Sequence, residues 1–233
     1  MKIQKKKFIY KKYEGKLFKL YPLDNSIDGK IILNSKKLEK KELFYLKNLK
    51  KSSPSIFFDI GANSGFYSIM TSNFGFTKIY SFEPLNKMIN RLKDNIKLNN
   101  LENLIEIIKF PIGESNRFAN IYKSDNNLGG TSLLCSNQRI KESKLEMITL
   151  LSFVNQRNIN QIDAIKIDIE GYEDRVLDNF FNNSPKTLYP QLIIIEHTSS
   201  NEWLSNIIID LINKFNYAII DKTRSNSILK KND

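Results

Sequence analysis

The stretch at residues 56–65, which reads Ile-Phe-Phe-Asp-Ile-Gly-Ala-Asn-Ser-Gly, constrains the fold more than any other part of the chain. A short apolar run leads into a turn of small residues, and a helix-compatible segment follows at 66–73. This order predicts a strand, a tight turn and a helix. In an open α/β sheet, ligands bind just outside the carboxyl ends of the strands, so we expect Asp59 and the turn after it to line a crevice.

A second acid, Glu83, ends the next apolar run and lies 22 residues after Gly61. This is about the interval at which an acid of a nucleotide-binding unit meets a ribose hydroxyl. The middle position of a dinucleotide fingerprint holds Asn63 instead of glycine, which disfavours a pyrophosphate. The turn and the acid together favour a nucleoside that carries a small charged amino acid, as S-adenosylmethionine does. The alternative is that Gly61 and Gly65 only close the turn and Glu83 is a solvated acid.

Length and composition bound the class of protein. A chain of 233 residues is long enough for one sizeable α/β domain. No apolar run approaches the ~20 residues of a membrane span, so we expect a soluble, cytoplasmic protein. The single Cys135 excludes an internal disulfide, and we expect it to be a small core residue.

The positive charge is concentrated at one end of the chain. Residues 1–53 hold 16 Lys and 5 acids and therefore carry all of the net charge of +11. Such a segment can bind nucleic acid, anionic lipid or an acidic glycan. It contains no Arg, whose guanidinium group is the preferred bidentate donor to bases and phosphates. The other interpretation is therefore that these lysines only form a solvated surface.

The order of segments predicts an α/β fold with an N-terminal extension at 1–53 and a main domain at 54–233. In the extension we expect a hairpin of strands at 8–13 and 16–21, a turn at Asp28-Gly29, and a helix at 35–49 with Ser35 as N-cap. The main domain should alternate strands with helices, with strands at 56–60, 78–82, 104–110, 164–168, 191–196, 217–220 and 227–230, and helices at 66–73, 85–98, 150–158, 173–181 and 202–215. The segment at 119–135 breaks this alternation and predicts a β-rich insertion, with a mobile loop at 125–130 over the site.

Acids follow two further predicted strands. Asp168 shares a sheet face with Lys166, because strand side chains alternate, and a buried lysine needs a partner. We therefore expect an ion pair between Lys166 and an acid near the crevice. Glu196 and His197 end the neighbouring strand, so they could converge with Asp168 to hold a divalent ion or to transfer protons. The alternative is that Asp168 or Glu170 only caps the following helix and that His197 is structural.

In these motifs the sequence resembles the FkbM family of S-adenosylmethionine-dependent methyltransferases. The resemblance covers roughly residues 40–200. Asp-Ile-Gly-Ala-Asn-Ser-Gly at 59–65 is common to many methyltransferases, whereas Lys-Ile-Asp-Ile-Glu-Gly-Tyr-Glu at 166–173 points to this family. The other matching segments are Phe-Glu-Pro at 82–84, the helix end with Asn95 and Asn99-Asn100, and Gly-Thr-Ser-Leu at 130–133.

The resemblance implies a Rossmann-like class I methyltransferase fold, with a mostly parallel seven-stranded sheet, helices on both faces and an antiparallel last strand. It implies O-methylation, most often of a sugar or glycan hydroxyl, with S-adenosylmethionine as cofactor. It places the methionine end of the cofactor in the turn after Asp59, the ribose on Glu83 and the adenine by Ile112. The implied cofactor-binding residues are Asp59, Gly61, Ala62, Asn63, Gly65, Glu83, Pro84 and Ile112.

The catalytic candidates are His197, Asp168 and Lys166, because methyl transfer to a hydroxyl requires alignment and the removal of one proton. Some sugar O-methyltransferases that resemble this family use a divalent ion, which implies Mg²⁺ on Asp168, Glu196 and His197. One rival is an RNA 2'-O-methyltransferase or another nucleic-acid methyltransferase that uses the basic N-terminus. Base methylation is disfavoured, because no Asp/Asn-Pro-Pro-Tyr-like block follows the strand at 164–168 and Cys135 has no Pro-Cys setting for a cytosine C5 nucleophile. The non-enzymatic alternative is a polyanion-binding module.

Overall fold

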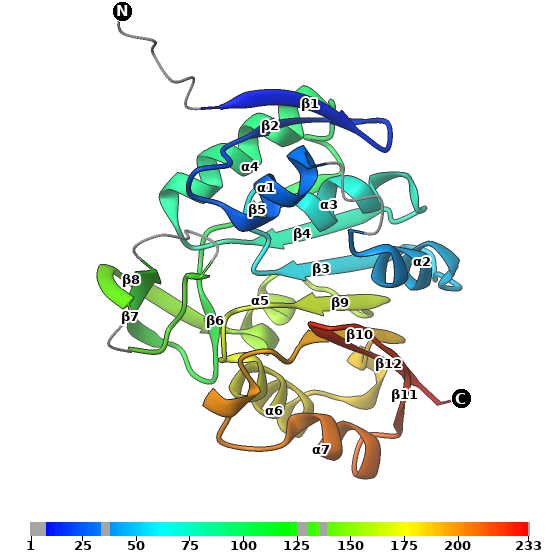
Figure 1. Ribbon diagram of the computed structural model, residues 1–233. Coiled ribbons are helices and arrows are strands. Elements are labelled where there is room, and N and C mark those ends of the chain that lie inside the picture. Colours follow the sequence, from blue (N-terminus) through cyan, green and yellow to red (C-terminus); the bar gives the residue numbers. More distant parts are fainter. Residues whose placement is uncertain (1–7, 34–37, 125–129, 136–138, 233) are drawn as a thin grey trace, which may run out of the picture.

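The computed structural model describes residues 8–33, 38–124, 130–135 and 139–232 (Figure 1). A seven-stranded sheet forms its centre, in the order β11-β12-β10-β9-β3-β4-β5. β12 pairs antiparallel with both of its neighbours, and the other pairs are parallel, so the predicted class I methyltransferase fold is confirmed. The strands are β3 (Ile56–Ile60), β4 (Lys78–Phe82), β5 (Ile105–Ile108), β9 (Ala164–Ile167), β10 (Leu192–Glu196), β11 (Tyr217–Lys222) and β12 (Asn226–Lys231).

The sheet separates two apolar cores because successive strand residues face opposite sides. Phe57 of β3 belongs to one core and Phe58 to the other. On the Phe57 side lie α3 (Phe66–Met70), continued by a 3₁₀ turn at Thr71–Asn73, and α4 (Asn86–Leu98). The helices on the Phe58 side are α5 (Leu150–Gln156), α6 (Glu173–Asn183) and α7 (Ile207–Asn213) (Figure 1).

The N-terminal extension packs on the Phe57 side. Its hairpin of β1 (Ile9–Tyr13) and β2 (Lys16–Leu20) is confirmed. The predicted turn at Asp28-Gly29 is wrong, because both residues lie inside α1 (Ser26–Ile32), which Asn25 caps by accepting a hydrogen bond from Ile27 N at 3.2 Å. The second helix, α2 (Lys40–Asn48), is shorter than expected, and the predicted cap Ser35 lies outside the described residues. Phe18, Leu20, Ile31 and Leu46 are fully buried in this core.

The predicted β-rich insertion is a small sheet of β6 (Ile112–Gly113), β8 (Arg139–Thr149) and β7 (Arg117–Ser124). Most of the loop predicted at 125–130 lies outside the described residues. Ser132 pairs with Tyr122, so the segment at 130–135 runs beside β7. Cys135 is exposed there, which corrects the expectation of a core cysteine. Within the described ranges, no helix has both the length and the apolar character that crossing a membrane requires.

Candidate active site

Two adjoining cavities open at the carboxyl edge of the sheet, where the strand order reverses between β3 and β9. In doubly wound sheets this is where ligands bind. The first, called the polar cavity, has a volume of about 280 Å³ and is lined by residues that include Glu39, Tyr67, Lys166, Glu196 and Asn226. The second, called the apolar cavity, has a volume of about 50 Å³ and is lined by residues that include Phe82, Glu83, Phe110, Ile112 and Leu133. The two cavities share Gly61, Asn63 and Asp168.

The turn after β3 brings its backbone against the end of β9. Gly61 has a φ of +82°, and a Cβ at this position would lie 1.8 Å from the carbonyl oxygen of Asp168. Gly61 N donates to Phe82 O at 3.0 Å, which fixes the turn on β4. Only glycine satisfies both the backbone conformation and the contact.

Glu83 is the acid of the apolar cavity. Its two oxygens accept hydrogen bonds from Asn63 N at 3.0 Å and from Leu85 N at 2.9 Å. Burial raises the pKa of Glu83 to about 7. Each carboxylate oxygen has more than one lone pair, so the same oxygens can still accept hydroxyl groups.

The other predicted cofactor residues divide between the cavities. Pro84 and Ile112 line the apolar cavity, and Ala62 lines the polar cavity. Asp59 and Gly65 line neither of these two cavities. Asp59 lies behind the turn, where its Oδ2 accepts hydrogen bonds from Ser68 N at 2.9 Å and from Ser68 Oγ, so it anchors α3.

The N-terminal extension makes side-chain hydrogen bonds to the turn that follows β3. Asn25 Nδ2 donates to Asn63 Oδ1 at 2.7 Å, and Ser64 Oγ donates to Asp28 Oδ1 at 2.8 Å. The other Asp28 oxygen accepts from Tyr21 N at 2.8 Å. These residues were not identified in the sequence, because their role depends on contacts between segments far apart in the chain.

The predicted ion pair is confirmed at the floor of the polar cavity. Lys166 Nζ lies 3.0 Å from Asp168 Oδ2. Burial lowers the pKa of Lys166, but the carboxylates of Asp168 and Asp59 outweigh it, and the pKa is raised overall. Lys166 therefore stays charged inside the protein. The side chain of Asp168 is 36% exposed, so it remains accessible from the cavities.

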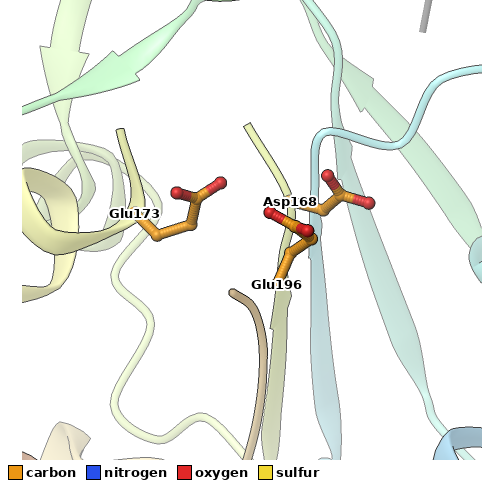
Figure 2. Close-up of side chains that lie close together, drawn as sticks. All are labelled: Asp168, Glu173 and Glu196. Carbon is orange, nitrogen blue, oxygen red and sulfur yellow. The ribbon is translucent and has the colours of Figure 1, made fainter. Parts of the chain in front are cut away.

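Glu196 and Glu173 lie beside Asp168, and oxygens of the three acids lie within 4.8 Å of one another (Figure 2). Glu196 Oε1 accepts from Thr198 N at 2.7 Å, whereas Oε2 is buried without a partner among the described residues. Burial, and then the charge of Asp168, raise the pKa of Glu196 to about 7. The polar cavity thus holds a buried carboxyl group with one oxygen free.

His197 does not join these acids, so its predicted convergence with Asp168 and Glu196 is wrong. It follows Glu196 directly, and adjacent residues of an extended chain face opposite sides. Its Nδ1 lies 3.0 Å from Ser227 Oγ, and its ring lines a separate groove beside α7. The residue that joins Asp168 and Glu196 is instead Glu173.

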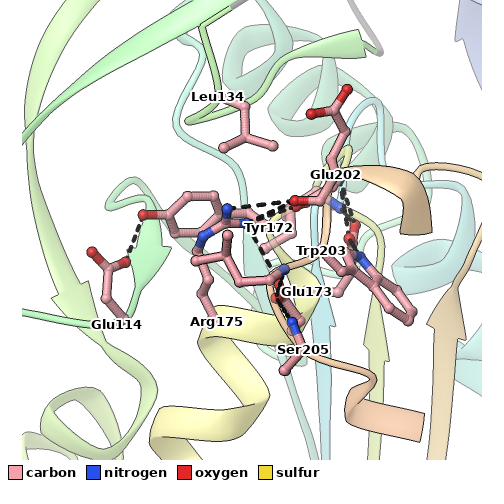
Figure 3. Close-up of polar contacts among 12 residues, drawn as sticks. Glu114, Leu134, Tyr172, Glu173, Arg175, Glu202, Trp203 and Ser205 are labelled. Carbon is pink, nitrogen blue, oxygen red and sulfur yellow. Dashed lines mark hydrogen bonds and ion pairs between the residues drawn. The ribbon is translucent and has the colours of Figure 1, made fainter.

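The segment at 169–173 holds the start of α6 in position (Figure 3). Glu173 accepts hydrogen bonds from Ile169 N at 2.7 Å, Gly171 N at 3.1 Å and Trp203 Nε1 at 2.9 Å. Tyr172 OH donates to Glu114 Oε2 at 2.6 Å and so ties α6 to the insertion. The side chains of Glu173 and Tyr172 therefore already make structural hydrogen bonds.

Comparisons with known proteins find one matching family model and several solved structures with a similar fold. A family model described as methyltransferase FkbM domain matches residues 59–219. A methyltransferase FkbM structure from Methylobacillus flagellatus has a TM-score of 0.53 at 16% identity, over 78% of this chain and 44% of that chain. This chain thus spans less than half the length of that relative. No curated protein matches the sequence.

Two further solved structures have a similar fold. An rRNA methylase from Streptococcus thermophilus has a TM-score of 0.50 at 10% identity, over 83% of this chain and 95% of that chain. A methyltransferase structure from Streptococcus mutans, solved in complex with SAH, has a TM-score of 0.50 at 11% identity, over 83% of this chain and 97% of that chain. At these identities the likeness is one of fold.

Proposed function

This chain belongs to the FkbM methyltransferase family, and on this premise we propose that it transfers the methyl group of S-adenosylmethionine to a hydroxyl of a sugar or glycan. The observation that carries the proposal is the pair of cavities that meet at Gly61, Asn63 and Asp168. One cavity has mostly apolar walls, with Glu83 on one side and Asp168 where it meets the other cavity, which suits a nucleoside. The other combines charged and amide side chains with the rings of Phe66 and Tyr67, which suits the polar edges and apolar faces of a sugar.

The residues of the apolar cavity fit the cofactor. Glu83 would accept the two ribose hydroxyls, Phe110 and Ile112 would contact the adenine, and the turn at Gly61 leaves room for the methionine end. The free volume of about 50 Å³ is smaller than a nucleoside, so we expect lining side chains to shift when the cofactor binds.

Asp168 is assigned as the proton acceptor because it is the carboxylate that lines both cavities. Bound S-adenosylmethionine would supply its methyl group to the acceptor oxygen by in-line displacement, with its carbon–sulfur bond broken and a neutral thioether left, and Asp168 would take the hydroxyl proton. Lys166 holds Asp168 in position and balances its charge. His197 takes no part in this mechanism, because it lines a different groove.

The hydrogen bonds of Glu173 and the ion pair of Asp168 argue against the Mg²⁺ that the resemblance implies. Glu173 already accepts from backbone and indole N–H groups, and Asp168 already has an ammonium at 3.0 Å. A divalent ion would have to share Asp168 with the buried positive charge of Lys166. We therefore propose a reaction without a metal, in which Lys166 supplies the positive charge.

The rival nucleic-acid function has less support. The polar cavity is lined by four acids, Glu39, Asp168, Glu170 and Glu196, which would repel phosphates. Two lysines of the extension make contacts within the protein. Lys11 Nζ donates to Ile32 O at 2.6 Å, and the exposed Lys41 Nζ lies 2.8 Å from Asp221 Oδ1.

The proposed function is tested by methyl transfer from labelled S-adenosylmethionine to glycans, nucleotide sugars and RNA, with EDTA or Mg²⁺. We expect label in a sugar-containing acceptor, none in RNA, and rates that differ less than about twofold between EDTA and Mg²⁺. Salt-sensitive transfer to RNA would overturn the choice of acceptor. Loss of activity in EDTA with recovery in Mg²⁺ would overturn the reaction without a metal.

The pKa of Glu83 makes cofactor binding dependent on pH. Two hydroxyl donors require the ionised carboxylate, which predominates above its pKa of about 7. We expect affinity for S-adenosylmethionine, measured by calorimetry, to be full near pH 8 and to fall by up to about tenfold per unit below pH 7. Glu83→Gln should bind weakly with a flatter profile, and any slope that it retains comes from other groups, including the cofactor's own amine. Identical slopes in the two proteins would contradict the assignment.

A further inference from the structure

Two buried side-chain oxygen atoms without hydrogen-bond partners in the described part of the chain belong to residues that line the polar cavity. They are Glu196 Oε2 on β10 and Asn226 Oδ1 on β12, and neither has a hydrogen-bond partner among the described residues. Glu196 and Asn226 are direct register partners on the two antiparallel strands. They are only 6% and 4% exposed, and both line the cavity. Buried acceptors without donors are costly, so this wall is built for a group that supplies hydrogen atoms.

The orientation of the Asn226 amide follows from its neighbours. Its Nδ2 donates to Glu42 Oε1 at 2.8 Å and to Glu39 Oε2 at 3.2 Å. Reversing the amide would place a carbonyl oxygen against two carboxylates, which cannot donate when ionised. Thr223 Oγ donates to the same Glu42 oxygen at 2.8 Å and helps to hold it. Oδ1 is therefore the atom left free.

Carboxyl groups outnumber lysines around these two oxygens. Glu39 and Glu196 line this part of the cavity, and Lys166 is already paired with Asp168. The remaining lysine that lines the cavity, Lys30, is exposed. A neutral hydroxyl could satisfy one oxygen, but a group with a positive charge and several N–H donors satisfies both and offsets the carboxylate.

We infer that the methyl acceptor carries a protonated amine, as an amino sugar does, and that Glu196 and Asn226 bind this ammonium while Asp168 faces the hydroxyl that is methylated. The inference rests on the proposed function for its reaction and adds the chemical class of the acceptor. Glu196 and Asn226 are thereby specificity-determining residues.

The test compares two acceptor pools that differ only in the amine. One pool contains 2-amino, 3-amino and 4-amino hexosides, and the other contains the same hexosides after N-acetylation. Transfer from labelled S-adenosylmethionine is measured in EDTA for the native protein, Glu196→Gln and the matched control Glu106→Gln, whose carboxyl group lies in surface ion pairs with Lys78 and Arg157. Calorimetry with S-adenosylmethionine, carried out on all three proteins, monitors folding and the cofactor site.

We expect at least about tenfold faster transfer to the free-amine pool, the scale of one charge-assisted hydrogen bond. Glu196→Gln should reduce this preference to within about threefold and keep cofactor affinity, whereas Glu106→Gln should retain the preference. Equal transfer to both pools, a preference that survives in Glu196→Gln, or transfer to neutral glycans alone would overturn the inference and leave the proposed function intact. Absence of cofactor binding and of transfer to any acceptor would instead overturn the proposed function.

Discussion

Replacing Gly61 with alanine is expected to abolish measurable binding of S-adenosylmethionine and to destabilise the protein. The new Cβ would lie 1.8 Å from Asp168 O, and the residue would keep a φ of +82°. Relief of this clash is opposed by the backbone hydrogen bond from Asp168 N to Ile60 O at 3.0 Å, which holds the end of β9 beside β3. We expect a loss of roughly 3 kcal/mol or more of unfolding free energy, from overpacking and backbone strain together. Denaturant unfolding and calorimetry measure the two effects.

Gly29→Ala is the matched control. Gly29 lies within α1, and a Cβ there would meet nothing within 4 Å. Alanine is the better helix former by about 1 kcal/mol, so this variant should be as stable as the native protein or more so. If Gly61→Ala matched it in stability and cofactor affinity, the close approach of the turn to β9 would not be needed for either.

Asp168→Asn is expected to reduce kcat for methyl transfer by about 10²-fold to 10⁴-fold, the range attributed to a general base. The asparagine keeps an oxygen for Lys166 Nζ, which lies 3.0 Å from the native side chain, so the cavity floor should stay in place. Cofactor affinity should remain within about threefold of the native value, because Glu83 and the turn at Gly61 are unchanged. Rates are measured with the best acceptor from the labelled screen, and affinity by calorimetry.

The control for this variant is Asp210→Asn, which removes a surface charge paired with Lys214 on α7. It should leave both kcat and cofactor affinity unchanged. If Asp168→Asn lost cofactor affinity and turnover to the same extent, Asp168 would support the cofactor, and the assignment as proton acceptor would be wrong.

The central sheet was predictable because its strands are short apolar runs separated by helical patterns, as at β3 and β4. Two elements, α1 and β8, could not be predicted. α1 contains Gly29 and depends on Asp28, which is buried against Tyr21 N and Ser64 Oγ. β8 is rich in charged residues, and its outer half is stabilised by pairing with β7, with little burial of its own side chains.

The site was predictable where it depends on the ends of parallel strands. This rule placed Asp168 and Glu196 together, but the alternation along the chain turned His197 away. Asn226 could not be found in this way, because antiparallel pairing of β12 brings it opposite Glu196 from 30 positions further along the chain. Glu39 is likewise brought to the cavity by packing of the extension, where Tyr67 OH donates to it at 2.6 Å.

Asn63 belongs to both cavities and is held from two directions, by Glu83 through its backbone N–H and by Asn25 through its side chain. A ligand in either cavity therefore acts on the same residue. Any factor by which a bound cofactor changes the affinity for the acceptor must equal the factor by which the acceptor changes the affinity for the cofactor. The extension supplies Asn25 and lines the polar cavity. It therefore contributes to the coupling between cofactor and acceptor as well as to the binding of the acceptor.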